Sequence, residues 1–366
     1  MCVGLHRQSK VLQRGVMHSR RGKFSSAAIT KSIFVSSVWV AIVAKMSAAA
    51  GGRTEILQKV ARVNEKGPYI GIVVPNAFEM NPLLNGSIFA QSPLSPIDIS
   101  GRRFYIGEIE SKKVIVVMTG LAMLNAGITT QLLFDYFDVS GVIHYGIAGN
   151  ANNNLNIGDI TIPKYWAHTG LWNWQRYGDG PDNELALEAN GDYTRDIGYI
   201  HFGDYNNPAS DRDNYLNNVW FQPEEVFPVT GTPEVRQHNF WVPVDGTYLE
   251  VAKKLEEIQL VSCLNSTFCL QQPSKVVIVE RGASSSIFVD NAAYRDYLHN
   301  KFNVSPIDME SASVSLVCLT NNVPFIAFRS LSDLAGGSAT ANEASIFAAL
   351  AATNAVTFLK AFINSL

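Results

Sequence analysis

The feature that most constrains this chain is a series of short, continuous apolar runs, rich in β-branched residues and bounded by glycine or proline. Such runs are typical of strands that are buried on both faces of a sheet. Between them, apolar residues recur at helical spacing over residues 125–137 and again over Glu343–Leu366. The alternation predicts an α/β fold with helices on both faces of a sheet. The expected strands are Ile70–Val74, Val114–Met118, Val142–Tyr145, Asp159–Ile162, Lys275–Val279 and Phe325–Phe328.

The composition suits a globular chain with one sizeable core. Of the 366 residues, 47% are apolar and 17% are charged, which excludes a disordered or fibrous protein. The length allows two domains or one large α/β domain with insertions. From Glu55 onward there are 20 Lys and Arg against 32 Asp and Glu, a formal net charge of −12. Because phosphate binding needs a basic surface, we expect neither nucleic acid nor an anionic membrane as a main partner.

The first 54 residues are predicted to be a leader or targeting segment, and residues 55–366 to form the folded domain. The leader has nine Lys and Arg, no Asp or Glu, and an apolar run over Ile33–Ala44. This order is typical of a secretory signal, although an organellar transit peptide or a translation start at Met46 would also explain it. The run is short of the roughly 20 residues that span a bilayer, so no stable membrane insertion is expected.

The cysteines and the glycosylation acceptor triplets indicate which cell compartment the protein enters. Cys263 and Cys269 flank a short polar loop and either pair in an oxidising compartment or stay reduced. Glycosylation acceptor triplets begin at Asn85, Asn265 and Asn303. Together with the leader these features favour the secretory route, extracellular or vacuolar, and leave an organellar or cytoplasmic location open.

Residues at about 166–245 form an aromatic-rich insertion that contains five of the six tryptophans. A long segment with this composition is expected to be an ordered excursion that packs on the rest of the domain. Elsewhere the sequence lacks a phosphate loop, a dinucleotide fingerprint, a hydrolase elbow and metal-ligand spacing. Kinase, dehydrogenase, α/β-hydrolase and metalloprotease functions therefore have no support, and no metal site is expected.

Polar residues follow several of the predicted strands. In an open α/β sheet, ligands bind beyond the carboxyl ends of the strands. Taken singly, each carboxylate has a structural explanation as a helix-terminal charge or cap. Their recurrence at strand ends indicates a site instead. The positions are Glu79, Thr119-Gly120, Gly146-Ile-Ala-Gly149, Asp308-Met-Glu310 and Arg329-Ser-Leu-Ser-Asp333.

In order and spacing, these segments resemble the nucleoside phosphorylase and nucleosidase superfamily, over about Ile70 to Leu366 without the insertion. The most specific pieces are Gly146-Ile-Ala-Gly149, Ile157-Gly-Asp-Ile160, Ile307-Asp-Met-Glu310 and Val323-Pro-Phe followed by Arg329-Ser-Leu-Ser-Asp333. Trp172-Asn-Trp-Gln-Arg and Phe288-Val-Asp-Asn-Ala-Ala-Tyr are similar to a plant subgroup of bark and vegetative storage proteins and cytokinin-riboside phosphorylases. The resemblance implies a single-domain fold, with a central mixed β-sheet partly closed into a barrel and flanked by helices, in a homo-oligomer.

The resemblance also implies cleavage of the N-glycosidic bond of purine nucleosides, including the N6-substituted cytokinin-riboside type. Glu310 would hold the ribose and stabilise its positive charge, with Met309 against the sugar. Asp333 would donate a proton to the departing base, a role that needs a raised carboxyl pKa. The remaining base-binding candidates are Ser332, which would orient Asp333, together with Phe288 and Gly149.

The attacking group is either phosphate or water. Glu79 matches the glutamate that serves water in nucleosidases, and Thr119, Gly120 and Gly71 are candidates for a phosphate or water site. Phosphorolysis, with inorganic phosphate as co-substrate and no cofactor, is the preferred interpretation. A water-using methylthioadenosine-type nucleosidase and a catalytically weak storage protein are the alternatives.

Further residues are assigned to the neighbourhood of the site. Arg102 and Arg103 lie where a neighbouring subunit lends an arginine to phosphate in such families, although surface arginines are the simpler interpretation. His168 and Trp172 are expected to form a lid or to contact the neighbouring subunit.

Overall fold

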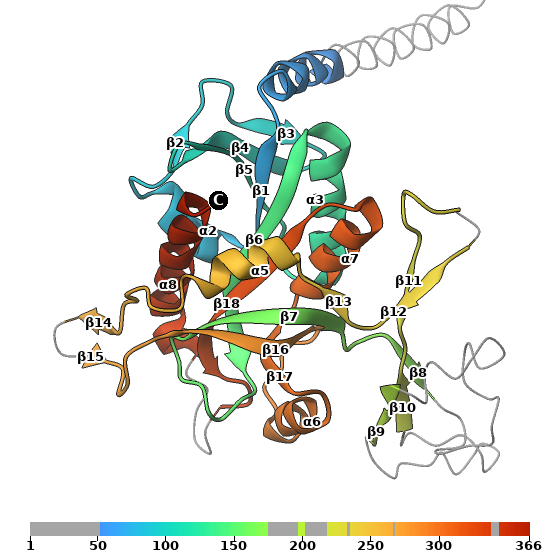
Figure 1. Cartoon of the computed structure of the whole chain (residues 1–366), viewed down its shortest axis with the longest axis vertical. Coiled ribbons are helices and arrows are strands. Elements are labelled where there is room, and N and C mark those ends of the chain that lie inside the picture. The colour runs from blue at the N-terminus through green and yellow to red at the C-terminus, as the bar shows by residue number, and fades with distance from the viewer. Residues whose placement is uncertain (1–51, 175–196, 202–217, 233–234, 266–267, 338–343) are drawn as a thin grey trace, which may run out of the picture. The chain divides into compact units, whose positions relative to one another are not determined.

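The computed structural model describes residues 52–174, 197–201, 218–232, 235–265, 268–337 and 344–366 (Figure 1). The chain divides into two units, Met1–Glu55 and Ile56–Leu366, and the fold below is that of the second. The predicted leader lies outside the described residues as far as residue 51.

Five strands close into a ring at the centre of the fold. They are β6 (Val139–Asn150), β7 (Ile160–His168), β16 (Val276–Ser284), β17 (Val304–Asp308) and β18 (Phe325–Leu334). β6 pairs with β18 in parallel and with β17 antiparallel, β16 pairs with β17 and β7 in parallel, and β7 meets β18 antiparallel. The ring confirms the expected mixed sheet that is partly closed into a barrel.

The rest of the large sheet extends from β6. β1 (Tyr69–Val74) lies between β6 and β5 (Lys112–Met118), parallel to both, and β4 (Arg102–Ile109) follows antiparallel to β5. Short strands β2 (Ala90–Gln91) and β3 (Ile97–Ile99) pair with β4. All six predicted apolar runs coincide with strands, because both faces of this sheet are covered (Figure 1). Only Asp159 and Lys275, at the start of two of the runs, lie one residue before the strands β7 and β16.

Helices cover the sheet, and both predicted ones are confirmed as α3 (Met123–Tyr136) and α8 (Ala344–Asn364). The Phe358 ring of α8 packs edge-on at 4.6 Å from that of Phe328 in β18. Among the described residues, α8 alone has the length and mean hydropathy (1.7) of a membrane span, but 56% of that stretch is buried inside the protein, as in a core helix. Further helices are α2 (Ala77–Leu84), α5 (Gly246–Lys253), α6 (Ala292–Phe302) and α7 (Ser311–Asn321), and residues 52–64 are also helical.

The aromatic-rich insertion begins later than predicted. β7 continues to His168 and pairs along its length with β16, and β13 (Val242–Pro243) returns to pair with it. Within the insertion, β8 (Trp172–Trp174), β10 (Asn218–Phe221) and β9 (Tyr199–His201) form a small sheet, and β11 (Glu224–Val226) pairs with β12 (Gln237–Asn239). The Phe221 ring lies 5.3 Å from that of Phe302 in α6, so the described part packs on the body as expected. Residues 175–196, 202–217 and 233–234 lie outside the described part.

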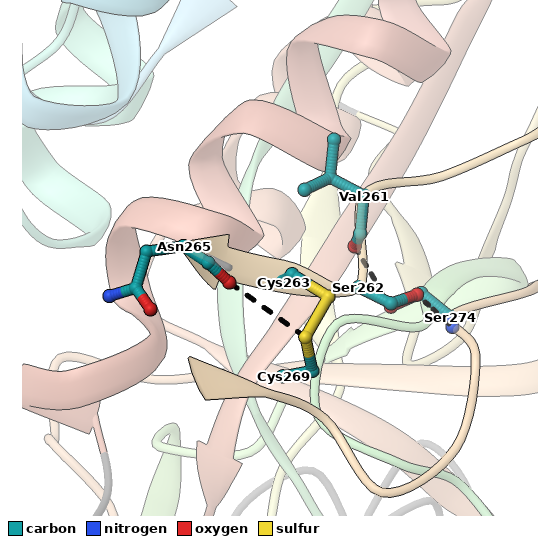
Figure 2. Close-up of a disulfide and its surroundings, with 6 residues drawn as sticks. All are labelled: Val261, Ser262, Cys263, Asn265, Cys269 and Ser274. Atoms are coloured by element: carbon teal, nitrogen blue, oxygen red, sulfur yellow. Dashed lines mark hydrogen bonds between the residues drawn. A yellow bond between two sulfur atoms is a disulfide. The ribbon is translucent and has the colours of Figure 1, made fainter. Parts of the chain in front are cut away.

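A disulfide joins Cys263 and Cys269 across the hairpin of β14 (Cys263–Asn265) and β15 (Phe268–Cys269) (Figure 2). This pairing decides between the two states that the sequence left open. The buried Asn354 of α8 ties the segment before the hairpin to the body. Its Nδ2 donates to the carbonyls of Val261 and Gly158, and its Oδ1 accepts from the N–H of Val261 at 2.8 Å.

Candidate active site

One cavity of about 240 Å³ brings together seven of the predicted site residues. The cavity lies at the carboxyl ends of β1, β6 and β18 and at the start of α7, the edge where the strand-end rule places a ligand. Its volume is close to the lower limit of about 300 Å³ for small-molecule pockets. The seven residues are Glu79, Gly149, Phe288, Met309, Glu310, Ser332 and Asp333.

Glu79 lies in the first turn of α2, with its side chain directed at the loop end of β6. Its Oε1 accepts a hydrogen bond from the N–H of Ile147 at 2.6 Å, and its Oε2 accepts one from Nδ2 of Asn76, the N-cap of the helix. Burial raises the pKa of Glu79 to about 8, although Arg329 and the Ile147 N–H favour the ionised form. A Cβ on Gly146 would lie 2.3 Å from Oε1, so only glycine fits under this carboxyl.

Glu310 precedes α7 and is 4% exposed. Its Oε1 accepts the N–H of Ala122 at 2.8 Å. Burial, together with the charge of Asp308, raises its pKa to about 7 against the opposing effect of Arg329. Ala122 has φ 74° and ψ 166°, a region that is otherwise almost confined to glycine. The strained backbone therefore presents its N–H to the carboxylate that the sequence assigns to the sugar.

Asp308 and Arg329 form a buried ion pair beside these glutamates. Arg329 is fully buried, and its Nε donates to Asp308 Oδ2 at 2.7 Å. Its Nη2 contacts Nε2 of His144 on β6. Asp308 also accepts from the hydroxyls of Ser284 and Ser311. Burial opposes ionisation of Asp308, but the Arg329 charge outweighs it with the help of the two hydroxyls, and the pKa of the carboxyl is lowered.

Asp333 enters the same cavity from β18. The strand's register shifts between Leu331 and Asp333, so Ser332 occupies a bulge and Asp333 pairs with Gly149. The Ser332 hydroxyl donates to Asp333 Oδ1 at 2.6 Å, in agreement with its predicted orienting position. A Cβ on Gly149 would lie 3.0 Å from that of Ala335, so glycine keeps this wall of the cavity close to the backbone.

Apolar side chains form the remaining wall. Phe288 is 62% exposed, and Leu121 and Ile287 are also exposed at the cavity. Among the described residues that line the cavity there are four carboxylates and no Lys, Arg or His. The described lining of the cavity therefore combines carboxylates with apolar side chains.

Comparison with known proteins identifies the family. A family model described as the phosphorylase superfamily matches residues 69–364, most of the chain. The chain belongs to the phosphorylase superfamily. The family resemblance inferred from the strand-end segments is thereby confirmed.

Relatives in the phosphorylase superfamily include storage proteins and nucleosidases. Bark storage protein A of Populus deltoides is 30% identical over 300 residues, covering 81% of this chain and 88% of that protein. A 5′-methylthioadenosine/S-adenosylhomocysteine nucleosidase of Psychromonas ingrahamii is 25% identical over 268 residues, 73% of this chain and 88% of that protein. Among solved structures, that of the Helicobacter pylori nucleosidase of this type is similar with a TM-score of 0.55 at 20% identity, covering 81% of this chain and 98% of that one. This structural likeness supports the shared fold.

The predicted anion site at Thr119, Gly120 and Gly71 is wrong as a cluster of free donors. The N–H of Gly120 donates to the carbonyl of Pro75 at 2.9 Å, and the N–H of Thr119 donates to that of Val74. The Thr119 hydroxyl donates to the Gly120 carbonyl at 2.6 Å. Gly71 lies inside β1, where a Cβ would be 2.7 Å from Leu133. None of the three lines the described part of the cavity.

The two arginines are bound elsewhere on the surface of this chain. Arg103 forms an exposed ion pair with Asp98. Arg102 donates to Thr129 at 2.7 Å and to Asn125 at 2.8 Å, both on α3.

His168 and Trp172 lie at the described start of the insertion. His168 Nδ1 is 2.5 Å from Glu224 Oε1, and Trp172 Nε1 donates to the carbonyl of Thr169 at 3.0 Å. Neither is among the described residues that line the cavity. Their assignment to a lid or a subunit contact stays a prediction.

Asp308 and Arg329 lie in the strand-end segments that indicate a site, but neither they nor His144 has an individual role in the sequence-based prediction. A signal was present, since arginine inside the apolar run of β18 must be buried and therefore needs a partner. Asp308, at the end of the short strand β17, was the available carboxylate.

Proposed function

We propose that this protein hydrolyses the N-glycosidic bond of purine nucleosides. The observation that carries the proposal is that Glu79, Glu310 and Asp333 share one acidic cavity with an apolar wall. A purine nucleoside has a flat apolar base and a polar sugar, which suits a cavity that combines carboxylates with apolar side chains.

The reaction assigns one step to each carboxyl. As the bond from the anomeric carbon to the base breaks, its electron pair goes to the purine, and Asp333 supplies the proton that neutralises it. The ribose ring becomes positively charged, and the Glu310 carboxylate stabilises this charge and holds the sugar hydroxyls. Water attacks the anomeric carbon and gives its proton to the ionised form of Glu79, which the Arg329 charge favours against the effect of burial. The protons thus balance without a cofactor.

The lining residues favour water over phosphate, although the sequence favoured phosphate. A phosphate dianion needs cationic groups or free N–H donors. The described lining offers carboxylates instead, and the nearby Arg329 is already paired with Asp308. Water needs only a carboxylate to orient it, and Glu79 is available at the cavity wall.

The test is to incubate the protein with adenosine, inosine, methylthioadenosine and isopentenyladenosine, each with and without phosphate. We expect the free sugar as product, at a rate independent of phosphate. Asp333→Asn should lose at least about a hundredfold in kcat, the usual contribution of a general acid, while Asp135→Asn on the surface of α3 should not. Formation of a sugar 1-phosphate would refute hydrolysis, and no cleavage of any nucleoside would refute the enzymatic function.

A storage role without turnover is the second candidate. It is favoured by the similarity to the Populus bark storage protein. The same panel separates the two, because a reserve protein has no need of turnover or of Asp333.

Two further features of the protein are part of the proposal. Leu121, Leu124 and Ile128 are exposed at the start of α3, and Leu121 also lines the cavity, so a second copy bound here would complete the cavity wall. Leu124→Arg should therefore shift the oligomer toward monomer in light scattering.

The disulfide supports passage through the secretory route, which cleavage of the leader in secreted protein would test.

A further inference from the structure

His144 supplies one of the hydrogen-bond acceptors that the buried guanidinium of Arg329 needs. The guanidinium has five N–H donors, and the Asp308 carboxylate takes Nε. Its Nη2 points at His144 Nε2 on the adjacent strand β6. A buried arginine without acceptors is costly, so this contact fixes the side chain in one orientation.

Hydrogen bonding fixes the tautomer of His144. Its Nδ1 lies 2.8 Å from the carbonyl oxygen of Val73, which can only accept, so Nδ1 carries the hydrogen. Nε2 is then the bare nitrogen and accepts from Arg329. The imidazole is fully buried, and burial together with the Arg329 charge lowers the pKa of His144 to about 3. The histidine therefore stays neutral and leaves the Arg329 charge intact.

The orientation of Arg329 matters because its Nη1, which donates to the backbone carbonyl of Phe328 at 3.4 Å, also lies near Glu79. A Cβ on Gly146 would lie 3.2 Å from Arg329 Nη1 and 2.3 Å from Glu79 Oε1, so the two groups flank the same glycine. The Arg329 charge favours the ionised forms of both Glu79 and Glu310. Because the charge acts over a short gap, a rotation of the guanidinium changes how readily Glu79 ionises.

We propose that His144 is a positioning residue, which locks Arg329 with Nη1 turned toward Glu79 and so keeps Glu79 able to take the proton from the attacking water. The inference rests on the proposed hydrolysis. In that step the water oxygen bonds to the anomeric carbon, its proton goes to Glu79, and the base leaves with the proton of Asp333. His144 touches none of the reacting atoms and exchanges no proton.

Several groups face Glu79 and set its titration together. Glu310 before α7 and Asp308 on β17 disfavour its ionisation, and Arg329 on β18 favours it. The hydroxyl of Tyr145 on β6 donates a hydrogen bond to the backbone carbonyl of Glu79 at 3.2 Å. Glu310, Asp308 and Tyr145 are unchanged in a variant of His144 alone, so a change in the Glu79 titration reports on the orientation of Arg329.

The test compares His144→Leu, which removes the acceptor, with His144→Gln, which restores one. In His144→Leu the acidic limb of the kcat/KM profile should move up by about one pH unit, and kcat at pH 7 should fall about tenfold, with KM unchanged. His144→Gln should keep kcat within about threefold. The control is His299→Leu, since His299 on α6 also contacts a backbone carbonyl through Nδ1 but does not contact Arg329.

Nuclear magnetic resonance gives a readout that needs no substrate. The ¹⁵N shifts of His144 should show a neutral ring with the hydrogen on Nδ1 down to pH 5, and the ¹³C titration of Glu79 should move upward in His144→Leu. An unchanged Glu79 titration and pH profile in that variant would overturn the inference. A charged His144 ring, or one with its hydrogen on Nε2, would overturn it even where His144→Leu does not fold. Failure of the wild type to cleave any nucleoside would overturn the proposed function instead, and the Glu79 titration alone would then decide the positioning role.

Discussion

Replacing Glu79 by glutamine tests the energetic cost of burying this carboxyl. Burial raises its pKa to about 8 in the folded protein, from 4.5 when it is solvated. The folded state therefore holds this proton more tightly than the unfolded state. Its contribution to stability is complete below pH 4.5 and is lost as the pH rises through about 8. The difference corresponds to about 5 kcal/mol.

Glutamine has no such proton, so the free energy of unfolding of Glu79→Gln should fall less with pH than that of the wild type. Between pH 4.5 and pH 9 the two should diverge by about 5 kcal/mol. The net gain at pH 9 is smaller. Asn76 donates to Oε2, and the glutamine NH₂ facing this donor costs about 1–3 kcal/mol. We therefore expect the variant to be more stable than the wild type by about 2–4 kcal/mol at pH 9, and inactive.

The assay is urea unfolding followed by circular dichroism at pH 5, 6, 7, 8 and 9. Glu256→Gln, an exposed site after α5, serves as the control and should follow the wild type. Glu310 is present in all three proteins, so its own titration cancels to first order. Parallel stability curves for the wild type and Glu79→Gln would refute the burial argument.

Three further substitutions test particular contacts. Gly146→Ala should cost about 1–3 kcal/mol in urea unfolding and lower kcat, because the added methyl collides with the Glu79 carboxyl; a neutral effect would contradict the close approach. Ala122→Gly should raise stability by about 1 kcal/mol by relieving a positive φ, and a loss measured by thermal unfolding would show that the backbone is unstrained. Replacing both Cys263 and Cys269 by alanine should cost about 2 kcal/mol through loop entropy, and reducing agent should destabilise the wild type but not this variant.

Strands of the large sheet were predictable because burial on both faces leaves only apolar residues in a run. β17 was missed for the opposite reason. Its sequence, Val-Ser-Pro-Ile-Asp, contains a serine, a proline and an aspartate, and it pairs through only a few positions on each side. Composition alone does not separate such a strand from a loop.

The meeting of Glu310 and Asp333 was predictable from the strand-end rule and the family motifs. The failure at Thr119 and Gly120 has a physical cause. Whether a backbone N–H is free depends on which carbonyl lies opposite, and the carbonyls of Val74 and Pro75 come from a strand end about 45 residues earlier. His144 was hidden in an apolar run, where sequence gives no sign of the arginine that it faces.

During refolding, Glu310 and Asp333 can meet only after the five-stranded ring has closed. Glu310 follows a strand that joins β6 from one side, and Asp333 ends a strand that joins it from the other. The hydrogen bond between Ala122 and Glu310 spans 188 positions. A refolding chain that has regained its helices but not this ring has two half-sites far apart. Turnover should therefore return late and all at once, with the slow long-range pairing that docks the last strand.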